Sequence, residues 1–311
     1  MQQIIQIDNK YKKLVLLAGF ASVATACTLI LMKAAVWWIS SSSAVLASLT
    51  DSLIDLMASA INLVAIKFAI VPADKSHRFG HFKAEALASL CQAAFIGGSS
   101  FLLICHGIER VFNPIEIEYA DYAIIVSIIS IFITIALILF QSYVVKVTKS
   151  LAIGADRYHY LSDIGLNVGV VISLVLSIQG FAWADGVFAV LLGFYILKGS
   201  YHIGIEAISV LLDKAMTDEE HENVMKAIIS VDGVISVHDL KTRRAGPQCF
   251  IQCHLVLSGS LSLHEAHQIA DKAERAILAL YPDADINMHM EPDCIETTKD
   301  VKFRDFICVK D

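Results

Sequence analysis

The stretch that decides the fold is Leu14–Ile39, LVLLAGFASVATACTLILMKAAVWWI, in which Lys33 is the single charged residue. A helix that crosses a bilayer needs about 20 predominantly apolar residues, so this run is long enough. Three lysines precede it, but it is too long for the apolar part of a signal peptide and has no cleavage site after it. We therefore predict that this run is the first of several membrane-spanning helices.

Five further apolar runs of similar length follow along the chain. They are Ala44–Val71, Ala84–Val111, Ala120–Val145, Leu151–Ile178 and Ala184–Leu211. The whole chain is 56% hydrophobic and 18% charged, whereas about a quarter of the residues of a soluble domain are charged. Almost all of this excess lies before Leu212. The sequence predicts an all-α membrane domain of six transmembrane helices over residues 1–212, surrounded by the lipid bilayer.

The loops between these runs predict the orientation in the membrane. Basic residues gather on one side, at Lys10, Lys12, Lys13, Lys75, Arg78, Lys83, Lys146 and Lys149. The longest loop of the other side is acidic. By the positive-inside rule both termini are cytoplasmic. The net charge of −7 is small and scattered, which argues against a nucleic-acid partner, and the seven cysteines have no disulfide spacing, as expected in a reducing cytoplasm.

The C-terminal third has the pattern of a soluble domain. Thr217–Glu220 is a capping box that opens a helix to about Ser230, and Ser262–Glu265 opens a second helix to about Tyr281. Three runs have the alternation of strands: Val234–Thr242, Gln248–Leu257 and Asp285–Met290. The order αββαβ predicts a small α+β ferredoxin-like domain, similar to metallochaperones, over residues 213–295. Residues 296–311 form a tail without expected regular structure.

Four ionisable residues interrupt the second and fifth apolar runs. Asp51 and Asp55 are four residues apart, and so are His159 and Asp163. Residues at this spacing lie on one face of a helix. Each ionisable group costs roughly 2.5–3.5 kcal/mol at the centre of a bilayer, so a structural accident is a poor explanation for all four. Two facing helices would offer three carboxylates and one imidazole to a divalent cation.

This donor set suits a tetrahedral Zn²⁺ site, although Fe²⁺, Mn²⁺, Co²⁺ and Cd²⁺ bind the same residue types. Two other classes of protein could use such a site. A membrane metalloenzyme would need an open metal position and a general base, and the sequence has no HExxH motif. A passive channel would favour weak, repeated sites. The sequence has no Walker motif that would indicate ATP-driven transport.

Histidines also gather outside the apolar runs. Asp74, His77 and His81 lie on the loop after the second run. Their spacing alone is equally compatible with a metal site and with a solvated basic loop. His238, His254 and His289 lie in three different expected strands, and His267 lies on the second expected helix. One small sheet could bring these four histidines to a shared site.

The motifs DSLID (Asp51–Asp55) and HYLSD (His159–Asp163), with PADKSHRFGH (Pro72–His81), resemble the cation diffusion facilitator family, specifically its bacterial zinc and ferrous-iron efflux members. The resemblance runs from Leu14 to about Pro292. It implies a homodimer in the bacterial inner membrane, with a cytoplasmic metal-binding domain. It also implies metal export driven by inward proton flow.

The resemblance assigns residues as well. It implies a second metal site at Asp74, His77 and His81, and a binuclear zinc site in the soluble domain at His238, His254, His267, His289 and Glu291, where close relatives carry Asp. We therefore expect a secondary transporter, not an enzyme. It would export Zn²⁺ (with Fe²⁺ or Cd²⁺ as further cargo) through Asp51, Asp55, His159 and Asp163 in exchange for protons.

Overall fold

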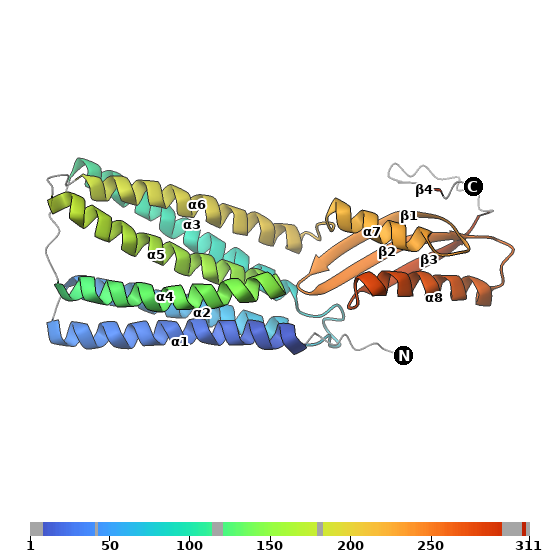
Figure 1. The fold of residues 1–311 in the computed structure, drawn as a ribbon, viewed down its shortest axis with the longest axis horizontal. Coiled ribbons are helices and arrows are strands. Elements are labelled where there is room, and N and C mark those ends of the chain that lie inside the picture. The colour runs from blue at the N-terminus through green and yellow to red at the C-terminus, as the bar shows by residue number, and fades with distance from the viewer. Residues whose placement is uncertain (1–8, 41–42, 114–120, 179–182, 294–306, 309–311) are drawn as a thin grey trace. The chain divides into compact units, whose positions relative to one another are not determined.

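The computed structural model describes residues 9–40, 43–113, 121–178, 183–293 and 307–308. The chain divides into two compact units at Leu211 and Leu212. The first unit is a bundle of six long helices within the described residues: α1 (Asn9–Ser40), α2 (Ser43–Ala69), α3 (Lys83–Phe112), α4 (Asp121–Thr148), α5 (Leu151–Ile178) and α6 (Ala184–Leu211). These helices run alongside one another, and α1 begins at the same end of the bundle at which α6 ends (Figure 1).

Five of these helices are long and apolar enough to cross a membrane, which confirms most of the predicted spans. The exception is α5, whose side chains in its second half lie largely outside the described residues. The distribution of side chains supports a lipid environment. Leu31, Phe132 and Phe194 are more than half exposed on the surface of the bundle, whereas Gln141 and Asp156 are fully buried within it. A soluble helical protein has the opposite distribution.

Close contact between α3 and α6 depends on two glycines. A Cβ atom added at Gly107 would lie 2.9 Å from the carbonyl oxygen of Gly186, and one added at Gly186 would lie 2.6 Å from the carbonyl oxygen of Gly107. Neither position has room for a side chain, so the two backbones can approach only because both residues are glycine. Small residues have this role in many membrane helix pairs.

The second unit is a small α/β domain. Its elements are α7 (Asp218–Ile229), β1 (Val234–Ala245), β2 (Gln248–Leu257), α8 (Leu263–Leu280), β3 (Asp285–Pro292) and β4 (Ile307–Cys308). The sheet order is β3-β2-β1-β4, with β2 parallel to β3 and antiparallel to β1. This confirms the predicted αββαβ order and both capping boxes. The pairing of Ile307 and Cys308 with β1 was not predicted, because the tail was expected to lack regular structure.

One face of this sheet forms the core of the domain. Ile251, Cys253 and Leu255 of β2 are buried against the apolar side chains of α7 and α8. Burial raises the pKa of the Cys253 thiol to about 11, so this cysteine behaves as a small apolar residue. Because side chains alternate along a strand, His254 lies on the face of the sheet that the two helices leave uncovered.

Candidate metal sites

The predicted intramembrane site is largely assembled in the structure. Asp55 of α2 and His159 and Asp163 of α5 each offer a ligand atom within 4.8 Å of the others. The Nε2 atom of His159 lies 3.1 Å from Oδ1 of Asp55, and only about a tenth of the His159 side chain is exposed. Two carboxylates and an imidazole from two helices therefore converge on one point, as metal coordination requires.

Asp51 is the predicted ligand that lies outside this group of three. It is one turn from Asp55 on α2 and is exposed, although its carboxylate is near enough to interact electrostatically with those of Asp55 and Asp163. The helical spacing predicted a shared face for Asp51 and Asp55. It did not predict that Asp55 would lie close to the two residues of α5 while Asp51 stays exposed.

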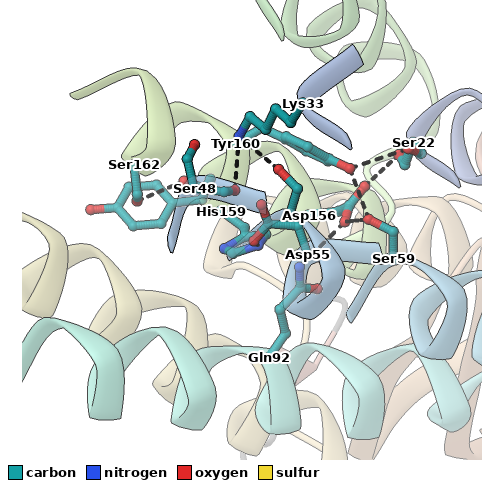
Figure 2. A network of polar contacts seen from close by, with 12 residues as sticks. Ser22, Lys33, Ser48, Asp55, Ser59, Gln92, Asp156, His159, Tyr160 and Ser162 are labelled. Carbon is teal, nitrogen blue, oxygen red and sulfur yellow. Dashed lines mark hydrogen bonds and ion pairs between the residues drawn. The ribbon is translucent and has the colours of Figure 1, made fainter. Parts of the chain in front are cut away.

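A buried carboxylate that the sequence analysis missed lies one turn from His159 on α5. Asp156 is completely buried and accepts hydrogen bonds from Gln141 Nε2 at 2.7 Å and from Ser22 Oγ at 2.5 Å, with longer contacts from Gln92 and Ser59 at 3.4 and 3.5 Å. These donors come from α4, α1, α3 and α2. Figure 2 shows the contacts of Asp156 beside His159 and Asp55.

Tyr160 adds to this network. Its hydroxyl donates to the carbonyl oxygen of Ser22 at 3.2 Å and lies 2.9 Å from Ser59 Oγ. Asp156 thus ties α5 to four other helices next to the metal ligands. A spacing of four residues marked the other ionisable residues. Asp156 lacks this signal, because it lies three residues before His159 and has no carboxylate four residues away.

The loop after α2 brings Asp74, His77 and His81 together. His81 Nε2 lies 3.5 Å and His77 Nδ1 lies 3.7 Å from oxygens of Asp74. Hydrogen bonds from the backbone N–H groups of His77 and Ser76 hold the pKa of Asp74 below its usual range, and the nearby imidazoles add to this effect. Asp74 is therefore a carboxylate at neutral pH, ready to bind a cation.

Backbone contacts orient the second histidine of this loop. His81 Nδ1 lies 3.3 Å from the carbonyl oxygen of Val71. A proton on Nδ1 leaves Nε2, on the side of Asp74, as the nitrogen that can bind metal, an arrangement that is common for histidine ligands. The bulky Phe82 that follows is buried and has ordinary helical dihedral angles at the start of α3.

In the soluble domain, three histidines lie in one row across the sheet. His238 of β1 is paired with His254 of β2, which is paired with His289 of β3. His254 Nδ1 donates to Oε1 of Glu291 at 2.6 Å, and His238 Nε2 lies 3.3 Å from the other carboxylate oxygen. His238, His254 and Glu291 form a group within metal-binding distance, and the His289 ring lies 5.0 Å from that of His254.

Electrostatics favour a negative charge at the centre of this row. Partial burial raises the pKa of Glu291, but the hydrogen bond from His254 and the charges of His254, His238 and His289 outweigh it, so the pKa lies below its usual value. The structure brings these residues together, whereas it places His267 on α8, on the other side of the sheet, 3.7 Å from Asp271.

Asp239 is a second residue that the sequence analysis missed. It lies in a bulge of β1 with a positive φ of 51°, and its Oδ2 is 3.8 Å from Nε2 of His254. Lys241 hydrogen-bonds to it and lowers its pKa. Asp239, His254 and His289 line a cleft of about 130 Å³ on the open face of the sheet. The bulge that directs Asp239 toward this cleft cannot be read from residue spacing.

Fold and sites together define a class of protein: a multi-pass membrane protein whose helical bundle holds a group of side chains that could bind a cation, with further donor clusters outside the bundle. Such an arrangement is typical of a metal-cation transporter. Two family models match the chain in agreement with this class. The cation efflux transmembrane domain matches residues 19–212, and the cytoplasmic domain of cation efflux proteins matches residues 216–293.

Curated relatives match along nearly the whole chain. The cation-efflux pump FieF of Shewanella oneidensis is 47% identical over 291 residues, which cover 93% of this chain and 98% of the relative. FieF of Klebsiella pneumoniae strain 342 is 40% identical over 289 residues, 93% of this chain and 96% of the relative. A solved structure of the metal-bound C-terminal domain of the CzcD transporter from Thermotoga maritima covers 26% of this chain and 99% of its own, with 22% identity and a TM-score of 0.25.

The chain belongs to the cation diffusion facilitator family of cation efflux transporters. It is a transporter of divalent metal cations, not an enzyme, which confirms the predicted class.

Proposed function

We propose that this protein exports Zn²⁺ from the cytoplasm in exchange for protons, through the site formed by Asp51, Asp55, His159 and Asp163. The observation that carries the proposal is the convergence of Asp55, His159 and Asp163 inside the membrane bundle. Ionisable side chains at this depth are costly unless a cation or a proton compensates them. A site that alternates between metal and protons satisfies that condition in every step of a transport cycle.

The donor set favours Zn²⁺ as cargo. Carboxylate oxygens and one imidazole nitrogen match the small tetrahedral shell that Zn²⁺ prefers. Fe²⁺ and Cd²⁺ remain alternative cargo, because first-row and neighbouring divalent ions bind the same donors and selectivity follows geometry. Asp51 completes the set of four when α2 turns toward α5 around the ion.

Proton coupling follows from competition at one site. Metal ligands must be deprotonated, so protons and Zn²⁺ exclude each other there. His159 is the natural proton carrier because an unperturbed imidazole titrates near pH 6.5. Protons entering from outside would displace the ion, and the deprotonated site facing the cytoplasm would bind the next one.

The other two clusters suit resident zinc ions. Asp74, His77 and His81 supply one carboxylate and two imidazoles, and His238, His254, His289 and Glu291 supply three imidazoles and a carboxylate, both ordinary zinc ligand sets. Because α8 lies on the other side of the sheet, His267 of the partner subunit is the better candidate to complete the soluble site. A homodimer in the bacterial inner membrane, with both termini cytoplasmic, fits this proposal.

Reconstitution tests the proposal directly. The purified chain in liposomes should move Zn²⁺ when an opposing pH gradient is present, and it should move protons in the opposite direction when a Zn²⁺ gradient is applied. Zn²⁺ movement that is equally fast without a pH gradient and causes no proton movement would contradict antiport. No movement of any divalent ion would contradict the transport site as a whole.

A further inference from the structure

Lys33 is a buried cation that the proposed transport cycle leaves without a role. It is the single charged residue in the apolar run Leu14–Ile39, and only 9% of its surface is exposed. A lysine inside a membrane bundle is costly and marks a functional position more often than a structural one. Lysines near helix ends usually extend to the membrane interface, but this side chain turns inward.

Two contacts fix the ammonium group against α2. Lys33 Nζ donates to Ser52 Oγ at 2.7 Å and to the carbonyl oxygen of Ser48 at 3.2 Å. Ser52 is itself almost completely buried. It directly follows Asp51 and precedes Asp55 by three residues, so the hydrogen bond holds the ammonium group on the turn of α2 that carries two of the proposed ligands. Figure 2 shows the contact of Lys33 with Ser48 of α2.

The ammonium group is within electrostatic range of Asp55, Asp51 and Asp163. Three carboxylates, a neutral imidazole, one divalent cation and one ammonium group carry a net charge of zero. Without Lys33 the loaded site would keep a net negative charge in a medium of low dielectric constant, where uncompensated charge is unfavourable. Among the described residues, the ammonium group donates its hydrogen bonds to two neutral acceptors, the Ser52 hydroxyl and the Ser48 carbonyl oxygen, so its charge is available to the carboxylates.

We propose that Lys33 is a permanent counter-cation of the transport site. Its charge neutralises the loaded site and lowers the affinity for the ion enough for release. The inference deepens the proposed function and rests on it. Lys33 repels a divalent cation at the site while it stabilises the carboxylates in the ion's absence. Lys33 places a positive charge near the metal ligands. It is not a ligand itself, because an ammonium group has no lone pair to donate.

Lys33→Gln tests this idea, because glutamine can still donate to Ser52 and the carbonyl of Ser48 but carries no charge. In liposomes containing the full-length protein, its KM for Zn²⁺ should fall at least about tenfold, because the substitution removes a positive charge that repels the divalent ion in a bundle where charges are weakly screened. Its maximal rate should fall as well, because release becomes slower. Lys33→Met, which removes the hydrogen bonds too, should shift KM in the same direction.

Two controls separate charge from structure. Lys33→Arg keeps the positive charge and should keep KM near that of the unsubstituted protein. Lys67→Met removes an equal charge from the same helix pair, but Lys67 stands over the Phe20 ring and is 12 residues beyond Asp55, about 18 Å along α2. It should leave KM unchanged.

A KM that is unchanged or raised in Lys33→Gln, in a protein that remains folded by size-exclusion chromatography, overturns the inference. If Lys33→Gln does not fold, Lys33→Met and Lys33→Arg decide it: a fall in KM in the first but not the second supports the counter-cation, and equal values in both overturn it. A purely structural lysine would lower the rate of all three variants without lowering KM. If the unsubstituted protein itself does not transport Zn²⁺, the result contradicts the proposed function and not this inference.

Discussion

His159 and Asp55 meet between α5 and α2, with Nε2 of the histidine 3.1 Å from Oδ1 of the carboxylate. The contact joins two helices that are 104 residues apart in the sequence. The imidazole N–H donates to the carboxylate, and the two side chains are near enough to bind the same cation. Any change that separates the two helices must therefore also open the cation site.

Asp163→Ala or Asp55→Ala is expected to abolish Zn²⁺ transport while the protein stays folded. Each change removes one ligand of the converged group, and a water molecule in its place cannot match a charged carboxylate. The measurement is Zn²⁺ uptake into proteoliposomes, with folding checked by light scattering. Glu109→Gln is the control, since this carboxylate is exposed on α3 beside His106 and should transport normally. Uptake near normal in either aspartate variant would show that the ion passes elsewhere.

A second prediction concerns the coupling of metal and protons. The apparent affinity for Zn²⁺ should weaken as the pH falls, because protons compete with Zn²⁺ for the imidazole and the carboxylates. His159→Asp should flatten this pH profile and reduce discrimination against Cd²⁺, because an oxygen replaces the nitrogen ligand. The profile is obtained from initial rates at fixed Zn²⁺ concentration. If the variant keeps the original profile, the coupled proton resides on another group.

Much of the fold was predictable because the membrane imposes simple rules. Apolar runs of sufficient length gave the membrane helices, and the capping boxes at Thr217 and Ser262 gave the starts of α7 and α8 within one residue. The pairs of ionisable residues on α2 and α5 were recognisable because helical spacing determines which side chains share a face. Each of these signals is local in the sequence.

The residues that were missed depend on contacts between distant segments. Asp156 is recognisable only once the bundle brings Ser22 and Gln141 to it, and Asp239 only once a bulge in β1 turns it toward His254. The position of Asp51 outside the group of three depends on how α2 packs against α5, which spacing alone does not determine. Irregular backbone and helix rotation are properties of packing, so a single sequence gives no direct signal for them.

A third prediction follows from the buried network. Asp156→Ala should lower the thermal stability of the protein, because Ser22 and Gln141 lose their shortest hydrogen bonds and keep only the carbonyl oxygen of Ala18 and the Ser22 hydroxyl as acceptors, at about 0.5–1.5 kcal/mol for each hydrogen bond lost. Asp156→Asn should be milder, since the oxygens Oε1 of Gln92 and Gln141 accept no hydrogen bond from the described residues and can receive the new N–H group. The melting temperature in detergent measures both effects. Equal melting temperatures for all three proteins would contradict a stabilising role.

The soluble domain supplies a prediction with a definite pH range. Because the pKa of Glu291 is lowered in the folded domain, its charge stabilises the fold above the ordinary carboxyl pKa of about 4.3, and this contribution is lost as the pH falls through the lowered value. Amide hydrogen exchange in β2 and β3 of Glu291→Gln should be faster than in the unsubstituted protein at pH 7. The difference should shrink as the pH falls through the lowered pKa. A difference that does not shrink on acidification would mean that packing, not charge, accounts for the effect.

The last prediction concerns His267, the expected ligand of the soluble domain that lies apart from His238, His254 and His289. His267 is exposed on α8 and contacts Asp271 one turn away, so His267→Ala should leave the domain folded. If His267 of the partner subunit completes the site, the variant should lose the tightening of the homodimer by Zn²⁺, and chelation should weaken the unsubstituted dimer to the same level. Light scattering of the full-length protein across a dilution series, with Zn²⁺ and with chelator, measures this. His264→Ala is a matched control on the same helix, where the histidine contacts only Gln268 at 3.0 Å among the described partners, and it should keep the response to Zn²⁺. An equal response in both variants would show that the two subunits do not share the metal through His267.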